Sequence, residues 1–562
     1  MAANKTSRSL TIATWLIFAC IGCTVVADDA AVRREMLRLT ESDKETRVAA
    51  IQSLADSKDS RLAAFFDAYQ LGKIYLWNGQ LVLCEQMEID AGLSVAPLSD
   101  PLTGKPLAEG DRRRIVGKGE LTDTRPRRPE RRLIVNAIRV LELYSPDRKK
   151  QLAAVVKLGG TRNADFLSHL RKVQQGESDH KVRHAIRESI ALIRLAGVSD
   201  ELTRGDRLAA AGELGEMCSA RGAPALKTLL KKMDREKDES FDEEAHSTFQ
   251  QALERIESYQ RKVRMFGYVF SGLSLGSVLI LMALGLSIIF GQMGVINMAH
   301  GELMMIGAYT TYEMQRLFGH SLPDHPANLF FVFAVPAAFC ASAFVGWLME
   351  RLVVRRLYGR PLETLLATWG IGLVLIQIVR LRYGDNIGVN SPTWLVGSIE
   401  VFQDINLPYN RLFIIALTAC CVLLVHWLMN YTRQGLLVRA TVLNRETAAS
   451  LGVNTRWADG FTFAFGAGLA GVAGCALTLI GGVTPDMGQN YIVDSFLVVV
   501  TGGVGELAGV VWAGLGIGAL TKILEPIFAT IWGKVLILLV VFVFIQWRPA
   551  GLFPPKGRLA DV

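Results

Sequence analysis

Residues 285–309 read GLSIIFGQMGVINMAHGELMMIGAY, a stretch that is apolar and rich in Gly and Met. Four polar side chains interrupt it: Gln292, Asn297, His300 and Glu302. In hydrocarbon, a polar group without a hydrogen-bond partner is costly, so such side chains face protein or a water-filled route. The stretch therefore predicts a membrane segment beside which a polar solute passes.

The composition changes sharply along the 562 residues of the chain. Residues 28–262 are as charged as a soluble protein, whereas residues 266–555 consist mainly of long apolar runs with short breaks. The formal net charge of +8 is compatible with nucleic-acid binding, but basic clusters between apolar runs are more often topology signals. We therefore predict an all-α fold, a soluble domain followed by a polytopic transmembrane domain. Its surroundings are membrane lipid and not nucleic acid.

Residues 1–27 have the pattern of a signal peptide. Lys5 and Arg8 precede an apolar run, and small residues suited to cleavage lead up to Ala27. An uncleaved membrane anchor is the alternative. Export places the following domain in the periplasm, where disulfides persist. A bridge between Cys84 and Cys218 is compatible with that location, and so are two buried thiols.

The soluble domain contains a recurring helical pattern. Residues 48–54, 152–158 and 208–214 each begin with Leu or Val followed by two alanines, and each follows a charged turn. A looser copy of this pattern begins at Val182. Paired amphipathic helices of this kind bury their apolar faces by stacking on their neighbours. We expect an α-solenoid that resembles HEAT repeats, with an ordinary helical bundle as the alternative.

An insertion with β character interrupts these repeats at about residues 73–130. Residues 74–83, IYLWNGQLVL, predict a hairpin around the Asn78-Gly79 turn, and the following Pro- and Gly-rich residues predict a loop. Residues 111–132 are strongly basic, a pattern that suits an acidic partner or lipid headgroups but is more often a solvated face. The soluble residues 28–262 contain no GxSxG, HExxH or paired CxxC motif, so we expect no catalytic site and no metal site there.

The second half predicts eight or nine membrane spans, because its apolar runs are long enough to cross a bilayer. They occur at about 267–290, 294–315, 328–350, 362–381, 410–431, 461–482 and 533–547, with one or two more in residues 491–524.

Basic residues predict the orientation. Clusters of arginine lie in residues 351–360 and 433–456, and such clusters mark cytoplasmic loops. The first span then starts outside, where the signal peptide delivers the soluble domain. Arg380, Arg382 and Arg411 would face outward, against this rule.

Five motifs carry a resemblance to a known family. They are IFGQMGVINMAHGELMMIGAY at 289–309, LLATWGIGLVLIQ at 365–377, RxxxxNxExAxxLGVN at 439–454, LVVVTGGVGELAGVVWAGLGIG at 497–518 and RPAGLF at 548–553. In this order they resemble the permease subunits of ATP-binding-cassette importers of the branched-chain amino acid family. The residues of the first two motifs, together with the exported N-terminal extension, are most similar to the urea permease branch of this family.

This resemblance implies the partners and the coupling site. The chain would pair with a homologous second permease in the bacterial inner membrane, above two cytoplasmic ATP-binding subunits, and a periplasmic substrate-binding protein would deliver the solute. It would bind no cofactor and catalyse no reaction, because the partner subunits use the ATP. Residues 433–457 would form the cytoplasmic coupling loop, or else a plain amphipathic connector. Its matching residues are Arg439, Glu446, Ala448, Ala449 and Gly452.

The polar residues of the spans suit a neutral solute. Urea has one carbonyl acceptor and N–H donors on two nitrogens, so amides, hydroxyls and a neutral imidazole can replace its hydration. The residues expected to line its path are Gln292, Asn297, His300, Glu302, Thr368 and Gln377.

Other readings stay open. Asn297 and Gln377 are also suited to hydrogen bonds between helices, and His300 and Glu302 to a structural pair. Branched-chain amino acids or short-chain amides are alternative solutes, although a zwitterion would require paired charges. A membrane-tethered binding or scaffold module is the alternative class of function.

Overall fold

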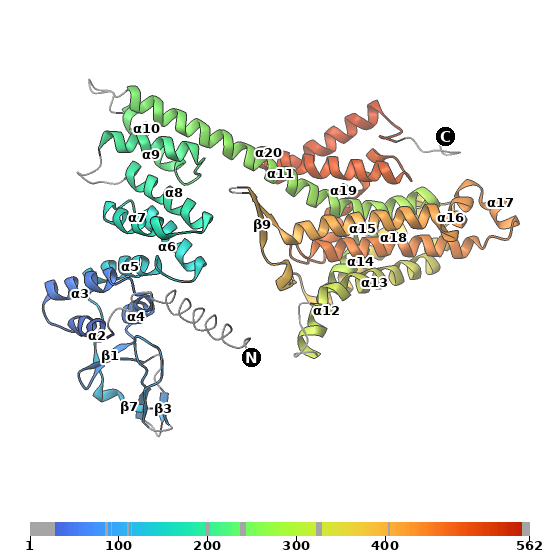
Figure 1. The fold of residues 1–562 in the computed structure, drawn as a ribbon. Coiled ribbons are helices and arrows are strands. Elements are labelled where there is room, and N and C mark those ends of the chain that lie inside the picture. Colours follow the sequence, from blue (N-terminus) through green and yellow to red (C-terminus); the bar gives the residue numbers. More distant parts are fainter. Residues whose placement is uncertain are drawn as a thin grey trace, which may run out of the picture. The chain divides into compact units, whose positions relative to one another are not determined.

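The computed structural model describes residues 29–84, 88–90, 93–109, 112–113, 115–196, 203–235, 243–321, 329–402 and 405–553. The chain divides into two compact units, Met1–Gln260 and Arg261–Val562 (Figure 1). The predicted signal peptide at residues 1–27 lies outside the described residues, so its cleavage stays a prediction.

The first unit is mainly helical. Its helices are α2 (Asp29–Arg38), α3 (Lys44–Asp56), α4 (Arg61–Gln70), α5 (Arg128–Glu142), α6 (Arg148–Thr161), α7 (Leu167–Gly176), α8 (His180–Ala196), α9 (Arg204–Glu216), α10 (Ala223–Arg235) and the start of α11 (Glu243–Met293).

The three repeated segments lie in α3, α6 and α9, and each of these helices begins at a polar capping residue. Asp43, Asp147 and Thr203 accept hydrogen bonds from backbone N–H groups in the first turn of these helices. Such caps satisfy donors that have no partner within the helix.

Three apolar cores follow one another along the first unit. Helix α5 contributes Ile134 to the first core and Val140 to the second. Helix α8 contributes Ile186 to the second core and Leu195 to the third, which also includes Phe249 of α11. Because α5 and α8 each belong to two cores, the helices form a continuous series. The specific resemblance to HEAT repeats stays a prediction.

The insertion is a small β region, as the sequence predicts. Its strands are β1 (Ile74–Trp77), β2 (Gln80–Leu83), β3 (Glu88–Asp90), β4 (Leu93–Pro97), β5 (Ala108–Glu109), β6 (Arg112–Arg113), β7 (Ile115–Gly117) and β8 (Thr122–Asp123), with the order β2-β1-β8 in one sheet and β3-β4-β7 in another. The predicted hairpin is confirmed, since Trp77 lies opposite Gln80. Asn78 and Gly79 both have positive φ, +46° and +76°, as a two-residue type I′ turn requires.

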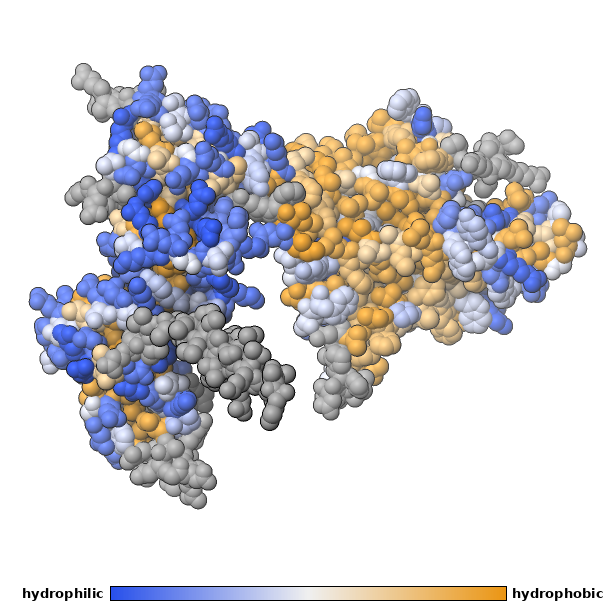
Figure 2. Space-filling view, in the orientation of Figure 1, coloured by the Kyte–Doolittle hydropathy of each residue, from blue (hydrophilic) through white to orange (hydrophobic). Residues whose placement is uncertain are grey.

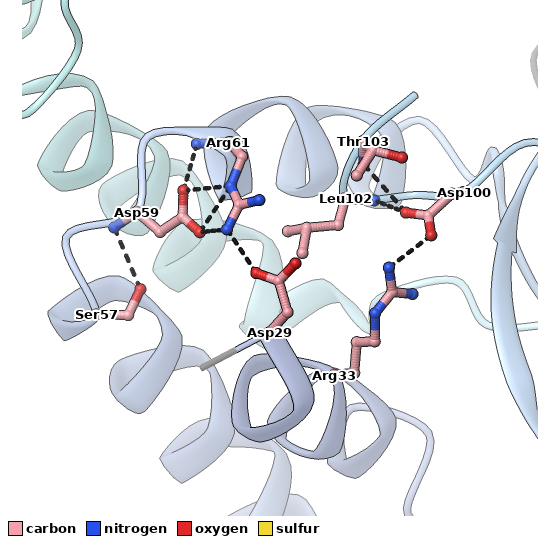
Figure 3. Close-up of polar contacts among 8 residues, drawn as sticks. All are labelled: Asp29, Arg33, Ser57, Asp59, Arg61, Asp100, Leu102 and Thr103. Atoms are coloured by element: carbon pink, nitrogen blue, oxygen red, sulfur yellow. Dashed lines mark hydrogen bonds and ion pairs between the residues drawn. The ribbon is translucent and has the colours of Figure 1, made fainter. Parts of the chain in front are cut away.

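Charged side chains connect this insertion to the first helices (Figure 3). Asp100 accepts hydrogen bonds from the N–H groups of Leu102 and Thr103 and pairs with Arg33 of α2 at 2.6 Å. At the start of α4, Arg61 pairs with Asp59 and with Asp29. These contacts hold the loop after β4 and the start of α4 against the first helix.

A buried ion pair holds α5 against α3. The Nη2 atom of Arg47 lies 2.8 Å from Oε1 of Glu130, and the two side chains are only 5% and 2% exposed. Arg47 also donates to the carbonyl oxygens of Glu41 and Ser42, so its charge is well solvated by protein. The pair therefore fixes the helix that follows the insertion onto the helix that precedes it.

Cys84 and Cys218 form no disulfide with each other. Cys84 is buried in the apolar core of the insertion, whereas Cys218 is half-buried after α9. The alternatives were a disulfide or two thiols, and the structure has free thiols at both positions.

The second unit is the helical part with the apolar surface (Figure 2). It continues α11 and adds α12 (His300–Ser321), α13 (Phe330–Leu352), α14 (Pro361–Tyr383), α15 (Tyr409–Tyr431), α16 (Arg433–Leu443), α17 (Arg445–Ser450), α18 (Thr455–Leu477), α19 (Met487–Gly502) and α20 (Leu507–Trp547), with a hairpin of β9 (Ser398–Phe402) and β10 (Ile405–Pro408). Among the described residues, six helices are long and apolar enough to cross a membrane, namely α11, α13, α14, α15, α18 and the first part of α20.

Helix α18 lies at the centre of this unit. In the most apolar 18 residues of α18, 89% are buried, whereas the share is 22% in the corresponding segments of α14 and α15. Its glycines permit close approach of neighbouring backbones: a Cβ atom on Gly307 of α12 would lie 2.1 Å from the carbonyl oxygen of Gly471. A Cβ atom on Gly285 of α11 would lie 2.3 Å from that of Gly466. Small residues of this kind let membrane helices pack backbone to backbone.

Two groups of loops occupy opposite ends of the helices. At the end that we call the α17 end, Gly291 touches Gly505, and Arg355 donates to the carbonyl oxygen of Arg456. At the other end, the β9 end, Ile387 pairs with Val483 in an isolated β-bridge. Successive long helices therefore run in opposite directions, as membrane spans joined by short loops do.

Helix α20 turns back on itself. A Cβ atom on Gly533 would lie 3.8 Å from the Cα atom of Glu525, whereas eight residues of straight helix span about 12 Å. After this turn the chain returns to the α17 end, where Leu552 donates its N–H to the carbonyl oxygen of Thr501. Together with α12, α19 and this second leg, nine helical legs run between the two ends in the described residues. The count of eight or nine membrane spans stays a prediction.

The second span begins later than expected. The sequence predicts a span over 294–315, but α12 begins at His300. Gly294 has a φ of +64°, which ends α11, and residues 294–297 are not helical. The polar residue Asn297 therefore lies in a linker and not within a helix.

Replacement of Gly307 by Leu tests the close packing of α12 on α18. The side chain has no space beside Gly471, so we expect the substitution to destabilise the protein by about 3 kcal/mol or more. Thermal unfolding of the purified protein in detergent measures the effect. Gly370→Leu is the matched control, because a Cβ atom at Gly370 meets no atom within 4 Å. Equal melting temperatures for the two variants would contradict this packing.

Candidate functional site

The linker between α11 and α12 positions the first polar residues. The side-chain Oδ1 atom of Asn297 accepts the N–H of Ala299 at 3.1 Å and so begins the turn that leads into α12. Asn297 is 1% exposed, and its Nδ2 group has no hydrogen-bond partner in the described part of the chain. Asn297 thus presents one buried, unsatisfied donor.

His300 holds α12 against α11. Its Nε2 atom lies 3.0 Å from the carbonyl oxygen of Met282, and because a carbonyl only accepts, Nε2 carries the proton. In the neutral ring Nδ1 is then an acceptor, and it has no partner among the described residues. Residues 300 and 302 point about 200° apart around the helix, so His300 and Glu302 do not form the structural pair considered above.

Glu302 and Thr368 lie along the contact between α12 and α14. The N–H of Met298 donates to Oγ1 of Thr368 at 3.2 Å. One turn further along α14, a Cβ atom on Gly372 would lie 3.1 Å from Cδ of Glu302. Glu302 is 5% exposed, and its Oε2 atom has no partner in the described residues. This seam therefore contains an unsatisfied carboxylate oxygen about one turn of α14 away from a hydroxyl group.

Gln377 lies apart from these residues. It is exposed on the outer face of α14, next to Val374 and Ile378, which are exposed as well. The structure therefore does not bring Gln377 together with the other predicted path residues.

Gln292 lines a cavity of about 490 Å³ between α11, α15, α16 and the start of α20. Its Oε1 atom accepts a hydrogen bond from Thr462 of α18 at 3.2 Å, which fixes the amide. The other polar residues of the wall are Ser287, His426, Asn430, Arg439 and Glu506. The cavity lies at the α17 end of the unit.

Sequence reasoning missed His426 and Asn430 in this wall. They are four residues apart on α15, and Nδ2 of Asn430 lies 3.1 Å from Nδ1 of His426. A polar pair one turn apart near the end of an apolar span was the available signal.

The predicted coupling loop forms two short helices, α16 and α17. Asn444 caps α17 and Asn454 caps α18, each through its side-chain oxygen. Gly452 has a φ of +85°, a conformation that ends α17 and that other residues rarely adopt. Of the other matching residues, Arg439 lines the cavity, Ala448 is buried, and Glu446 and Ala449 are exposed.

Helix α17 is held firmly by its neighbours. The guanidinium of Arg445 lies over the ring of Tyr358, 4.6 Å from the centroid, and pairs with Asp459 near the start of α18. Through Arg445, α17 contacts both the loop after α13 and the central helix α18. Two exposed apolar residues, Leu443 and Leu451, flank its acidic Glu446. We call this surface of Leu443, Glu446 and Leu451 the α17 corner.

The described residues contain no cluster of the usual metal ligands. Among them, no three His, Cys, Asp or Glu side chains lie close enough to hold a metal ion.

Comparisons with known proteins match the second unit. Residues 268–545 match the model of the family described as the branched-chain amino acid transport system permease component. The high-affinity branched-chain amino acid transport system permease protein LivH of Salmonella typhimurium is 29% identical over 292 residues, which cover 50% of this chain and 94% of that protein. The corresponding protein BraD of Pseudomonas aeruginosa is 28% identical over 289 residues, 50% of this chain and 93% of its own length.

The match extends to an archaeal relative but to no solved structure. A probable branched-chain amino acid transport permease protein of Methanocaldococcus jannaschii is 26% identical over 294 residues, 49% of this chain and 88% of that protein. No solved structure matches significantly. The family model covers α12 to α19 completely, together with most of α20 and the later part of α11. Residues 268–545 of the chain therefore belong to the family of permease components of branched-chain amino acid transport systems.

Proposed function

We propose that this chain is the translocation subunit of an ATP-binding-cassette importer that carries urea across the bacterial inner membrane. The observation that carries the proposal is the 490 Å³ cavity at the α17 end. Its wall combines Gln292, a predicted path residue, with Arg439, a predicted coupling residue. A movement of α16 therefore changes the shape of a space that the solute occupies.

The chemistry of the cavity suits a neutral solute. Amides at Gln292 and Asn430, the imidazole of His426 and the hydroxyl of Ser287 donate and accept hydrogen bonds without a net charge. Urea offers one carbonyl acceptor and N–H donors on two nitrogens, so these groups replace its hydration shell. Arg439 and Glu506 are the charged members of the wall, and they carry opposite charges.

The seam between α12 and α14 supplies further partners for such a solute. Asn297 Nδ2 is an unsatisfied donor, and Glu302 Oε2 is an unsatisfied oxygen, both in the buried part of the unit. A buried polar atom without a partner costs about 1–3 kcal/mol, which a polar solute passing the seam would recover. Gln377 joins the path in this proposal only where a second permease covers the exposed face of α14.

The distribution of arginine supports a cytoplasmic α17 end. Arg355, Arg360, Arg433 and Arg439 belong to its loops and helices. At the β9 end, Arg380 pairs with Asp385 and Asp486, so its charge is compensated and is a weaker topology signal. The first unit then lies in the periplasm, where a substrate-binding protein delivers the solute. The α17 corner faces the two ATP-binding subunits.

Branched-chain amino acids are the second candidate solute. The relatives are named as transporters of these amino acids, which favours them, and so does a second cavity of about 260 Å³ with charged side chains in its wall. There Lys522 lies 2.6 Å from Glu525, and Lys534 lies 3.8 Å from Asp494. A zwitterion requires paired charges of this kind, although each lysine here already has an acidic partner.

Uptake of labelled solutes decides between the two candidates. In a strain that lacks this gene, we expect the restored chain to restore uptake of radiolabelled urea at micromolar concentration, because neutral hydrogen-bonding groups line the path. Uptake of labelled leucine should not depend on the chain. If urea uptake is independent of the chain and leucine uptake requires it, the urea proposal is wrong. If neither depends on it, the membrane-tethered binding module becomes the better description.

Substitutions in α17 and directly after it test the coupling proposal. Gly452→Trp forces a left-handed conformation on a residue with a side chain, which costs about 1–2 kcal/mol, and Glu446→Ala removes the charge of the α17 corner. We expect each variant to lower solute uptake by about tenfold while ATP hydrolysis by the assembled complex continues. Ser450→Ala, an exposed change on the same helix, is the control and should transport normally. Unchanged uptake in both test variants would refute the role of α17.

A further inference from the structure

The first unit contains a cavity of its own. It has a volume of about 530 Å³ and lies among α4, α5 and the residues that follow α6. Figure 1 shows these helices in the first unit. Seven polar side chains line its wall, namely Gln70, Arg131, Arg132, Asn136, Arg139, Thr161 and Asn163. No role that we propose for the permease unit uses them.

The charge of this wall is entirely positive. Arg131, Arg132 and Arg139 line the cavity, and no acidic residue does. Across the described residues, none of these three guanidinium groups has an ion pair or a side-chain hydrogen bond. Other arginines of the same helical series are paired, as Arg47 is with Glu130 and Arg148 is with Glu177. The cavity therefore gathers unused donors that suit an anion.

The position of these arginines on α5 makes the binding of an anion more favourable. Helix α5 begins at Arg128, so Arg131 ends its first turn and Arg132 begins its second, near the positive end of the helix dipole. The acidic residue of that turn, Glu130, is buried and is engaged by Arg47 and by the N–H of Arg127. Among the described residues, no carboxylate forms an ion pair with Arg131 or Arg132. An anion bound in the cavity would compensate their charges.

Two apolar side chains complete the wall. Val135 of α5 and the buried Phe166 contribute hydrocarbon surface, and Arg132, Asn136 and Arg139 follow at the spacing of one helix face. The volume falls in the range of about 300–1000 Å³ that is typical of sites for small molecules. We propose that this cavity binds a small organic anion. Its carboxylate or phosphate group contacts Arg131, Arg132 and Arg139, and its apolar part contacts Val135 and Phe166.

This site gives part of the basic run at residues 111–132 a specific role. Arg131 and Arg132 are the last residues of that run, and folding places them beside Arg139 and the amides of Gln70 and Asn136. The proposed ligand is a soluble molecule. A lipid headgroup offers the same phosphate chemistry, and the experiment separates the two sources.

Calorimetric titration of the full-length protein in phosphatidylcholine nanodiscs tests the proposal. The probes are phenyl phosphate, inorganic phosphate and phenol. We expect phenyl phosphate to bind at one site more tightly than inorganic phosphate, with an affinity that falls as salt rises, because exposed charges are screened. Phenol should not bind. The same affinity in discs that contain phosphatidylglycerol supports a soluble ligand, whereas competition by that lipid overturns it.

Variants locate the site. Arg132→Gln with Arg139→Gln should weaken phenyl phosphate binding by about tenfold or more. The matched control is Arg171→Gln with Arg187→Gln, which removes the same charge from two exposed arginines of α7 and α8 outside the cavity. Val135→Trp fills the space without a change of charge and should abolish binding. Melting curves verify that each variant is folded.

Three results would overturn the proposal. They are binding of phenol as tight as that of phenyl phosphate, an unchanged affinity in the folded Arg132→Gln/Arg139→Gln protein, and an equal loss in the matched control.

Discussion

The second unit depends on the close approach of helix backbones along α18. Gly285 of α11 and Gly307 of α12 have no room for a side chain where they meet the backbone of Gly466 and Gly471 in α18. In a membrane, where apolar side chains gain little by leaving lipid, such contacts are a main source of helix association. They fix which helices are neighbours, and thereby which loops meet at each end. The cavity, the seam and the α17 corner all follow from that arrangement.

The same contacts connect the proposed sites mechanically. Arg445 joins α17 to Asp459 near the start of α18, and the middle of α18 touches Gly307 of α12. Thr462 of α18 holds the amide of Gln292 in the cavity wall. Helix α18 therefore contacts α17, α12 and the cavity wall, and in the proposed function it transmits a displacement of α17 to both. In the proposed function, these contacts link the solute path to ATP hydrolysis in the partner subunits.

Much of the fold follows from local sequence, and much of the site does not. The Asn78-Gly79 hairpin, the long apolar helices and the short helices at 433–450 rest on turn chemistry and hydropathy, which a single segment contains. The position of Gln377 on an exposed face and the pairing of Gln292 with Thr462 depend on packing between distant segments, which no periodicity encodes. The separation of His300 from Glu302 was predictable, because residues two apart on a helix point in nearly opposite directions. The late start of α12 also had a local signal in Gly294.

The proposed function requires the α17 end to face the cytoplasm and the β9 end to face the periplasm. The accessibility of engineered cysteines measures this orientation most directly. Ser450→Cys on α17 and Ser398→Cys on β9 place exposed thiols at opposite ends of the second unit. A maleimide that does not cross membranes is applied to spheroplasts and to inverted membrane vesicles, with the parent chain as background. The account predicts that Ser398→Cys is labelled in spheroplasts and Ser450→Cys only in inverted vesicles. Labelling of both thiols from the same side would contradict it.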